Sequence, residues 1–313
     1  MIKKIVKSVL QFPADALIAS SKKLPQRLDT HAHDAILGNP NLTAKFYPYQ
    51  ADRASYLLPK TDRKDQTTCN ELPIPPLDLR IHRYLGPAAE AYLATGKMYV
   101  AKMTDILEAS GVSAHGEDRV LDFGCGDGMM LRHFRETAER GEVWGVDING
   151  TEMVWCQQHL SPPFKFATTT SFPHLPFEDG YFDLVYSFSV FTHICDLAEA
   201  WLLELKRIVR RDGVLYLTIH DNHTVDLVLD ESRGEAFYQQ LHDAEKVLPF
   251  RDSEFAMFTI NRVPGGGIDF ERRQAQVFYD IDYIRQHWGN YLKILSITQE
   301  AYGYQTAIVL QKP

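Results

Sequence analysis

The sequence predicts an α/β fold built on an open, mostly parallel sheet, and three observations carry this prediction. From residue 88 to residue 220, helical and strand patterns alternate with short connections, which is typical of parallel strands joined by right-handed crossovers. A glycine-rich loop, GCGDG at 124–128, directly follows a buried strand pattern. Two last strand patterns, 291–303 and 304–312, are expected to pair as an antiparallel hairpin at the sheet edge.

The individual elements follow from hydrophobic periodicity and from end signals. Helices are expected at 88–111, 130–141 and 197–213, and each ends at a glycine, the residue that best tolerates the conformation of a helix end. Two further helices and the first five strands are expected at 151–160 and 281–289, and at 119–124, 142–148, 164–168, 181–190 and 214–220. With the final hairpin, the fold class is a Rossmann-like seven-stranded mixed sheet with helices on both faces.

The regions outside this alternating pattern are interpreted as additions to one domain. Residues 1–83 hold many Pro, Asp, Asn and Thr and little periodicity, so we expect an N-terminal arm or lid. Residues 84–313 form the main domain, and residues 221–276 form an insertion after the fifth strand that would cap an acceptor site. Within it, the glycines at 265–267 are expected at the tip of a hairpin.

Composition excludes several classes of protein. A net charge of -8 argues against a nucleic-acid-binding surface. The sequence also has no run of 18 apolar residues, which a membrane-spanning helix would need. The four scattered cysteines lack zinc spacing, so we expect reduced thiols, a cytoplasmic location and no metal site. Residues 1–12 have an apolar helical face; a terminal helix docked on the body is the expectation, and a membrane contact is the alternative. The oligomeric state is left open.

The glycine loop predicts a ligand site. In an open α/β sheet, ligands bind beyond the carboxyl ends of the strands, where the strand order reverses. The loop reads G-x-G-x-G rather than the G-x-G-x-x-G of dinucleotide sites, and Asp122 just before it would repel a pyrophosphate but suits an amino group or a sulfonium. Asp147 ends the next strand, where a carboxylate can accept both hydroxyls of a ribose or can cap the following helix. Together, the loop and Asp147 indicate a nucleoside-containing ligand.

These motifs carry a resemblance to a known family. The segments RVLDFGCGDG, VWGVDI, LPFEDGYFDLVYSFSV and LKRIVRRDGVLYLTIH resemble those of the class I S-adenosylmethionine-dependent methyltransferases with a domain of the type 11, 12 or 25 kind. The resemblance covers about residues 84–220 and implies S-adenosylmethionine as cofactor and S-adenosylhomocysteine as product. The residues it assigns to the cofactor, together with the acid before the loop, are Asp122, Gly124, Cys125, Gly126, Gly128, Asp147, Ile148, Thr170, Ser171, Ser187 and Phe188.

Within this implied site, the glycine loop faces the methionine part of the cofactor and Ile148 faces the adenine. Ser187 and Phe188 lie beside the sulfonium. Family members often carry an acid or amide that touches the adenine amine after the third strand. Here the stretch is TTTSFPHLPF, so Thr170, Ser171 or the backbone must serve.

The chemistry expected is methyl transfer to a small molecule, in which alignment of donor and acceptor supplies much of the rate. An oxygen acceptor, as in a sugar or glycan, also needs a base. His193, His220 and Tyr279 are the candidate catalytic residues, with local hydrogen bonding or packing as the alternative role of each. A non-catalytic cofactor-binding partner protein, and an N- or C-methyltransferase of a natural product or lipid, remain alternatives. A nicotinamide dehydrogenase is disfavoured by the glycine spacing.

Overall fold

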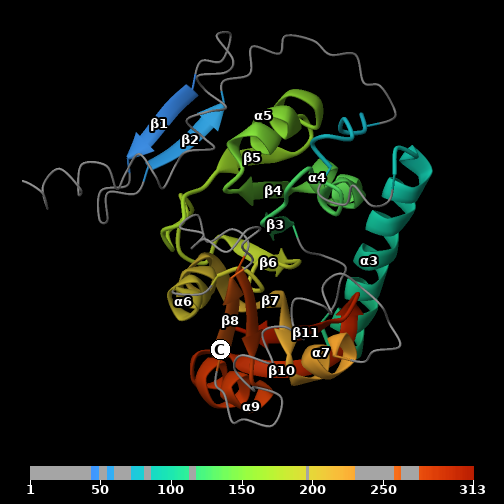
Figure 1. Ribbon diagram of the computed structural model, residues 1–313. Helices are drawn as coiled ribbons and strands as arrows, with labels where there is room; N and C mark the ends of the chain where they lie inside the picture. The colour runs from blue at the N-terminus through green and yellow to red at the C-terminus, as the bar shows by residue number, and fades with distance from the viewer. Residues whose placement is uncertain are drawn as a thin grey trace, which may run out of the picture.

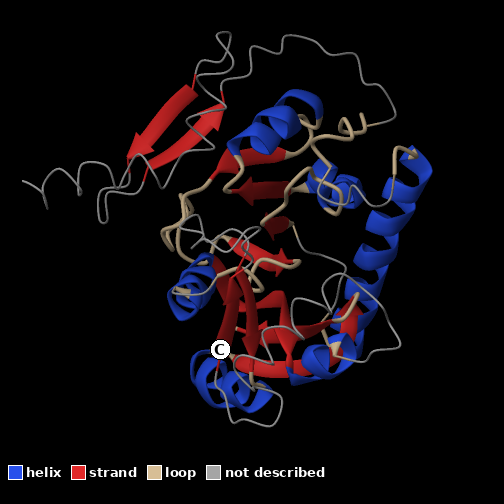
Figure 2. Cartoon of the chain, viewed as in Figure 1, coloured by secondary structure: helices blue, strands red, loops and turns tan. Residues whose placement is uncertain are grey.

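The computed structural model describes residues 44–48, 55–59, 72–80, 86–112, 118–194, 197–229, 257–261 and 275–313. In this part of the chain, a central sheet carries helices on both faces (Figures 1 and 2). No helix among the described residues combines the length and the apolar character needed to cross a bilayer. The predictions made for residues 1–12 and for the glycines at 265–267 lie outside the described residues.

Seven strands form the body of the sheet in the order β5-β4-β3-β6-β7-β11-β10. Their bounds are β3 (Arg119–Phe123), β4 (Glu142–Asp147), β5 (Lys165–Thr168), β6 (Phe182–Ser187), β7 (Val209–Asp221), β10 (Lys293–Tyr302) and β11 (Gln305–Gln311). The first five pair in parallel, and β11 pairs antiparallel with β7 and β10. The predicted mixed sheet with a reversed C-terminal hairpin is confirmed, and the glycine loop follows β3, where the strand order reverses.

Two short hairpins extend this sheet. In the N-terminal region, which was expected to be irregular, β1 (Ala44–Pro48) pairs antiparallel with β2 (Ser55–Pro59), and Leu57 of β2 pairs with Thr168 of β5. In the insertion, β8 (Met257–Asn261) pairs antiparallel with β9 (Ala275–Tyr279), as predicted, and β9 lies parallel to the end of β7. Strands as short as β1 and β2 show too little alternation for sequence to reveal them.

Alternate residues of the same strands face two separate cores. Val120, Tyr186 and Tyr216 belong to one core, and Leu121, Val185 and Leu217 belong to the other. The first core is closed by α3 (Ala89–Ala109), η2 (Leu131–Phe134), α4 (Arg135–Arg140) and α5 (Gly150–His159). The second is closed by α6 (Ala198–Ile208) and by the continuous turns α9 (Ile281–Tyr283), η4 (Ile284–Trp288) and α10 (Gly289–Tyr291). Helices therefore cover both faces, as the period-two pattern of the strands requires.

Two predicted boundaries are wrong, since the strand expected at 181–190 ends at Ser187 and the helix expected at 197–213 is also too long. The helix expected at 197–213 ends at Ile208, and β7 begins at Val209, which pairs with Phe182 of β6. Val209 is extended (φ -78°, ψ 140°) and Asp212 has a φ of 61°, so a helix cannot continue through these residues. A β-branched residue after the amphipathic stretch fits a strand as well as a helix, and pairing with β6 decides between them. A short helix, α7 (Asn222–Val228), follows β7.

Candidate functional site

The glycine loop turns sharply over the end of the neighbouring strand. Gly124, Gly126 and Gly128 all have left-handed backbones, with φ of 84°, 50° and 79°. Residues with a Cβ rarely adopt this region, so glycine is required at these alternate positions. The N–H groups of Gly124 and Cys125 both donate to the carbonyl of Val146 at 2.8 and 3.1 Å, which fastens the loop to β4. The main chain is therefore held at the switch point without side chains in the way.

Gly124 also makes a close approach that allows a stability test. A Cβ at this position would lie 2.1 Å from Cγ2 of Val190, in addition to the strain of a positive φ. The Gly124→Ala substitution should cost more than the 1–3 kcal/mol, roughly, of backbone strain alone, measured as the free energy of unfolding in urea. Gly303→Ala is the matched control, since Gly303 has a φ of 59° and nothing within 4 Å of its added Cβ. Equal costs at the two positions would contradict the clash. Adding Val190→Ala to the Gly124→Ala variant should recover only the part of the cost that exceeds backbone strain.

Asp147 joins the loop to the end of β4. One carboxylate oxygen accepts the N–H of Gly126 at 2.9 Å, and the other accepts the N–H of Asn149 at 2.8 Å. Burial raises the pKa of Asp147, and the N–H groups of Asn149, Gly126 and Ile148 oppose that rise. A carboxylate offers about four lone-pair sites, so its oxygens can still accept hydrogen bonds from a ligand. The alternative role, capping of α5, belongs to Asn149, whose side chain accepts the N–H groups of Thr151 and Glu152.

Asp122 points away from the rim of the sheet. Its side chain is 2% exposed and accepts a hydrogen bond of 2.9 Å from the hydroxyl of Tyr186, whose ring stacks on Phe134. Burial raises the pKa of Asp122 well above the ordinary range, although the Tyr186 hydrogen bond opposes this. The acid before the loop therefore lies beneath it, inside the first core. Cys125 is buried nearby, and a Cβ on Gly145 would lie 2.7 Å from its Sγ.

The residues expected around the adenine and the sulfonium lie at the ends of β4, β5 and β6. Thr170 is buried and its hydroxyl accepts the N–H of Phe172 at 3.2 Å, whereas Ser171 and the 36% exposed Ile148 reach the surface. At the end of β6, the hydroxyl of Ser187 is fully buried and has no hydrogen-bond partner within the described residues. Such a group has an unused donor and acceptor beside the place where a ligand would lie.

Phe188 directly follows β6 and is buried. Its ring packs against Tyr186, Tyr216 and Tyr302, with centroids 5.7, 5.6 and 5.0 Å away. The residue after the end of β6 is therefore part of an aromatic group on the α3 face of the sheet.

Two histidines lie near one another after β6 and at the end of β7. His193 is half-buried in the turn that follows β6, and its backbone N–H donates to the carbonyl of Val190 at 2.9 Å. His220 is 2% exposed, and its ring centroid lies 4.9 Å from that of Phe278 and 5.6 Å from that of Tyr304. Burial, with a smaller contribution from His193, lowers the pKa of His220 to about 3. His220 is therefore neutral at neutral pH and a weak base, and His193 is the more accessible of the two.

Tyr279 lies in the core rather than in the open. It is fully buried, and its hydroxyl donates to the carbonyls of Phe191 and Ile194 at 3.2 and 3.3 Å. The N–H of Val277 donates to the carbonyl of Thr192 at 2.8 Å. Strand β9 thus holds the turn that carries His193, which gives Tyr279 a positioning role.

Sequence reasoning missed a polar cluster beneath the loop. Asp127 is 3% exposed and accepts hydrogen bonds of 3.1 Å from the hydroxyl of Tyr92 and from the N–H of Met129. Arg132 is 5% exposed and lies 5.4 Å from the centroid of the Tyr92 ring. A buried arginine is unusual. The position of Arg132 shortly after the loop is the sequence signal that could have revealed this cluster. These contacts join α3 to the glycine loop.

A family model described as a methyltransferase domain matches residues 121–217, the stretch from β3 through most of β7 that contains the loop, Asp147 and the end of β6. Residues 121–217 therefore carry a domain of the class I S-adenosylmethionine-dependent methyltransferases. The cofactor of this methyltransferase family is S-adenosylmethionine.

Similar proteins carry related names. A malonyl-[acyl-carrier protein] O-methyltransferase of Geobacter sulfurreducens is 26% identical over 199 residues, which cover 63% of this chain and 70% of that protein. A phthiotriol/phenolphthiotriol dimycocerosates methyltransferase of Mycobacterium ulcerans is 31% identical over 101 residues, 32% of this methyltransferase and 36% of that protein. A solved magnesium protoporphyrin IX methyltransferase from Synechocystis, with bound S-adenosylhomocysteine, is 19% identical with a TM-score of 0.45, covering 74% and 92% of the two chains.

The geometry fits the methyltransferase cofactor at three points. The glycine loop has no side chain on its left-handed positions, and Asp147 keeps free lone pairs at the rim. The buried hydroxyl of Ser187 has no hydrogen-bond partner among the described residues where β6 ends. Asp122, in contrast, is turned toward Tyr186 in the core.

Proposed function

We propose that this protein transfers a methyl group from S-adenosylmethionine to a small-molecule acceptor, most simply to an oxygen atom. The observation that carries the proposal is the link between the loop and Asp147, in which the Gly126 N–H binds one carboxylate oxygen at 2.9 Å. This link places a bare glycine backbone beside a carboxylate with unused lone pairs, at the switch point of a parallel sheet. A nucleoside joined to a charged amino-acid chain needs both features together.

In this proposal, each group of residues has a separate task. Gly124, Gly126 and Gly128 let the main chain lie against the methionine part, and Asp147 accepts the ribose hydroxyls. Ile148 packs on the adenine, and Thr170 or Ser171 faces its amine. Ser187 and Phe188 lie beside the sulfonium, which supplies an activated methyl group when the cofactor is bound. The protein's part is then to align the acceptor and exclude competing water.

Transfer to oxygen requires a proton acceptor at the acceptor side of the site, and His193 is proposed for it. Its ring is half-buried in the turn after β6, next to the proposed sulfonium position, and a neutral imidazole accepts a proton near neutral pH. Tyr279 and strand β9 hold that turn, so the insertion would position the base as well as cover the acceptor. The relative named as an O-methyltransferase supports oxygen as the acceptor atom. A cytoplasmic location belongs to the same proposal.

Calorimetric titration of the full chain with S-adenosylmethionine and S-adenosylhomocysteine tests the proposal directly. Binding of both with dissociation constants on the order of micromolar is expected, because a preformed loop and carboxylate need little reordering. An acceptor screen that starts with sugars, phenols and acyl carboxylates then follows, with S-adenosylhomocysteine release as the readout. Binding without turnover on any acceptor would favour the non-catalytic partner protein, and binding of NADH instead would overturn the proposal.

A further inference from the structure

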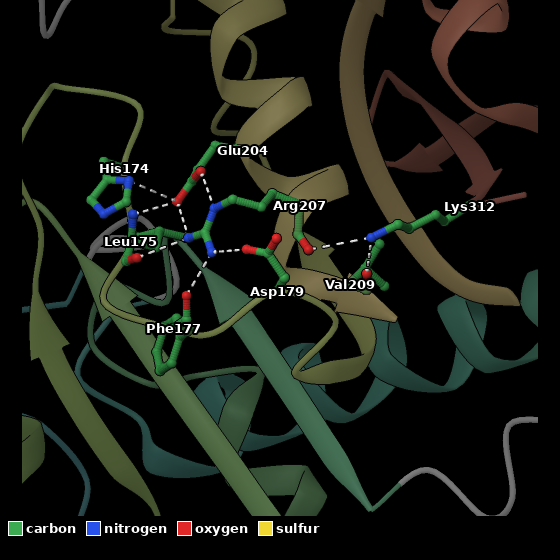
Figure 3. A network of polar contacts seen from close by, with 8 residues as sticks. All are labelled: His174, Leu175, Phe177, Asp179, Glu204, Arg207, Val209 and Lys312. Atoms are coloured by element: carbon green, nitrogen blue, oxygen red, sulfur yellow. Dashed lines mark hydrogen bonds and ion pairs between the residues drawn. The ribbon is translucent and has the colours of Figure 1, made fainter. Parts of the chain in front are cut away.

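An ion pair between the buried Glu204 and the half-buried Arg207 ties the loop between β5 and β6 to helix α6 (Figure 3). Glu204 of α6 is 6% exposed, and its carboxylate accepts two hydrogen bonds from Arg207, of 2.8 Å from Nε and 2.7 Å from Nη2. The same carboxylate accepts the backbone N–H of Leu175 at 2.6 Å. The parallel pair of bonds fixes the guanidinium plane, which a single contact would leave free to rotate.

Arg207 in turn holds the loop through its main chain. Its Nη2 donates to the carbonyl of Leu175 at 3.1 Å, and its Nη1 donates to the carbonyl of Phe177 at 2.7 Å (Figure 3). Nη1 also binds Asp179, whose side chain is 82% exposed, at 2.8 Å. The hydrogen bonds to Glu204 raise the pKa of Arg207, so the guanidinium stays charged. The loop is therefore fastened through backbone groups on both sides of the guanidinium.

The fastened segment continues directly into the residues proposed for the adenine. The loop leaves β5 at Thr168, and the N–H of Thr169 donates to the carbonyl of Asp147 at 2.9 Å, which ties its beginning to the strand end that carries the carboxylate. Further along the same loop, the backbone of Leu175 is tied to α6 by Glu204. The short stretch 170–174 between these ties contains Thr170 and Ser171. The position of this stretch is thus set at one end by β4 and at the other by the ion pair.

We infer that Glu204 and Arg207 are positioning residues for recognition of the adenine 6-amino group, an inference that rests on the proposed function. A buried ion pair is a weak source of net stability, because the cost of removing two charges from water offsets their attraction. Fixing one loop conformation is a purpose that this arrangement serves well, since the pair binds backbone groups of Leu175 and Phe177 and also contacts the side chains of His174 and Asp179.

Discrimination between two ligands tests this inference. The dissociation constants of S-adenosylhomocysteine and S-inosylhomocysteine, which differ at the 6-amino group, are measured by calorimetry for the wild type and for Glu204→Gln. We expect the variant to lose about tenfold in affinity for S-adenosylhomocysteine, the equivalent of one charge-assisted hydrogen bond. Affinity for S-inosylhomocysteine should fall less, so the preference for the amino group decreases.

Two further variants complete the design. Asp179→Asn removes only the exposed partner of Arg207 and should keep the wild-type preference. Arg207→Lys keeps a charge opposite Glu204 but loses the fork that reaches Leu175 and Phe177; it should show the reduced preference even if Glu204→Gln does not fold. An equal loss for both ligands, or no loss, overturns the positioning role and leaves the proposed function intact. Absence of binding to the wild type overturns the proposed function, and this inference with it.

Discussion

Replacing Asp147 with alanine should weaken the binding of S-adenosylhomocysteine by about a hundredfold, the sum of two charge-assisted hydrogen bonds worth roughly 1.5 kcal/mol each. The carboxylate is the group proposed to accept both ribose hydroxyls, and it also holds the Gly126 N–H at 2.9 Å. Its removal should therefore cost direct contacts and also loosen the loop. Calorimetric titration of the variant against the wild type measures the loss, and circular dichroism of both checks that the fold persists.

The pH dependence of S-adenosylhomocysteine binding gives a second test of the proposed role of Asp147. Burial raises its pKa, so the carboxyl protonates at a higher pH than the ordinary value of about 4. A protonated carboxyl accepts fewer hydroxyl hydrogen bonds, so wild-type affinity should fall as pH falls through the raised pKa. Asp147→Asn should bind weakly at every pH and show no such fall. An Asp147→Ala variant that binds as tightly as the wild type would refute the ribose assignment.

Replacing His193 with alanine should lower kcat by about a hundredfold or more on the acceptor found in the screen, the usual contribution of a positioned general base. The dissociation constant of S-adenosylhomocysteine should hardly change, since His193 is proposed to act on the acceptor and not on the cofactor. Steady-state kinetics and a parallel titration of the cofactor product separate these two effects.

His287→Ala is a suitable control for His193, because the exposed His287 stacks on Tyr283 at 4.2 Å and its Nδ1 lies 3.6 Å from Glu199 of α6. It should leave both kcat and cofactor affinity at their wild-type values. A matching loss of turnover and of cofactor affinity in His193→Ala would instead indicate a structural role for the turn after β6.

Much of the sheet could be predicted because its signals are local. The strand patterns at 119–124 and 142–148 and the glycines between them depend only on neighbouring residues, and the structure confirms both strands. The end of α6 could not be predicted, since Val209 pairs with Phe182 of β6 and such long-range pairing leaves no trace in the local pattern. The strands of the N-terminal region could not be predicted because they are too short to show a clear alternation.

The candidate site, like the fold, could be predicted only in part from the sequence. Spacing placed the loop and Asp147 together, and the structure shows their hydrogen bond, although the direction of the Asp122 side chain depends on Tyr186, 64 positions away. The partners of Tyr279, and the attachment of Leu175 by Glu204, likewise connect residues far apart in the chain.

By itself, the sequence determined the order of strands and helices, the glycine loop at the switch point and the family of the chain, because each depends on residue types within a short window. Only the tertiary structure decided which carboxylates face the ligand and which face the core, and which backbone groups Arg207 and Tyr279 hold. These outcomes depend on burial and on contacts between distant residues, and both arise only when the sheet and its helices pack together.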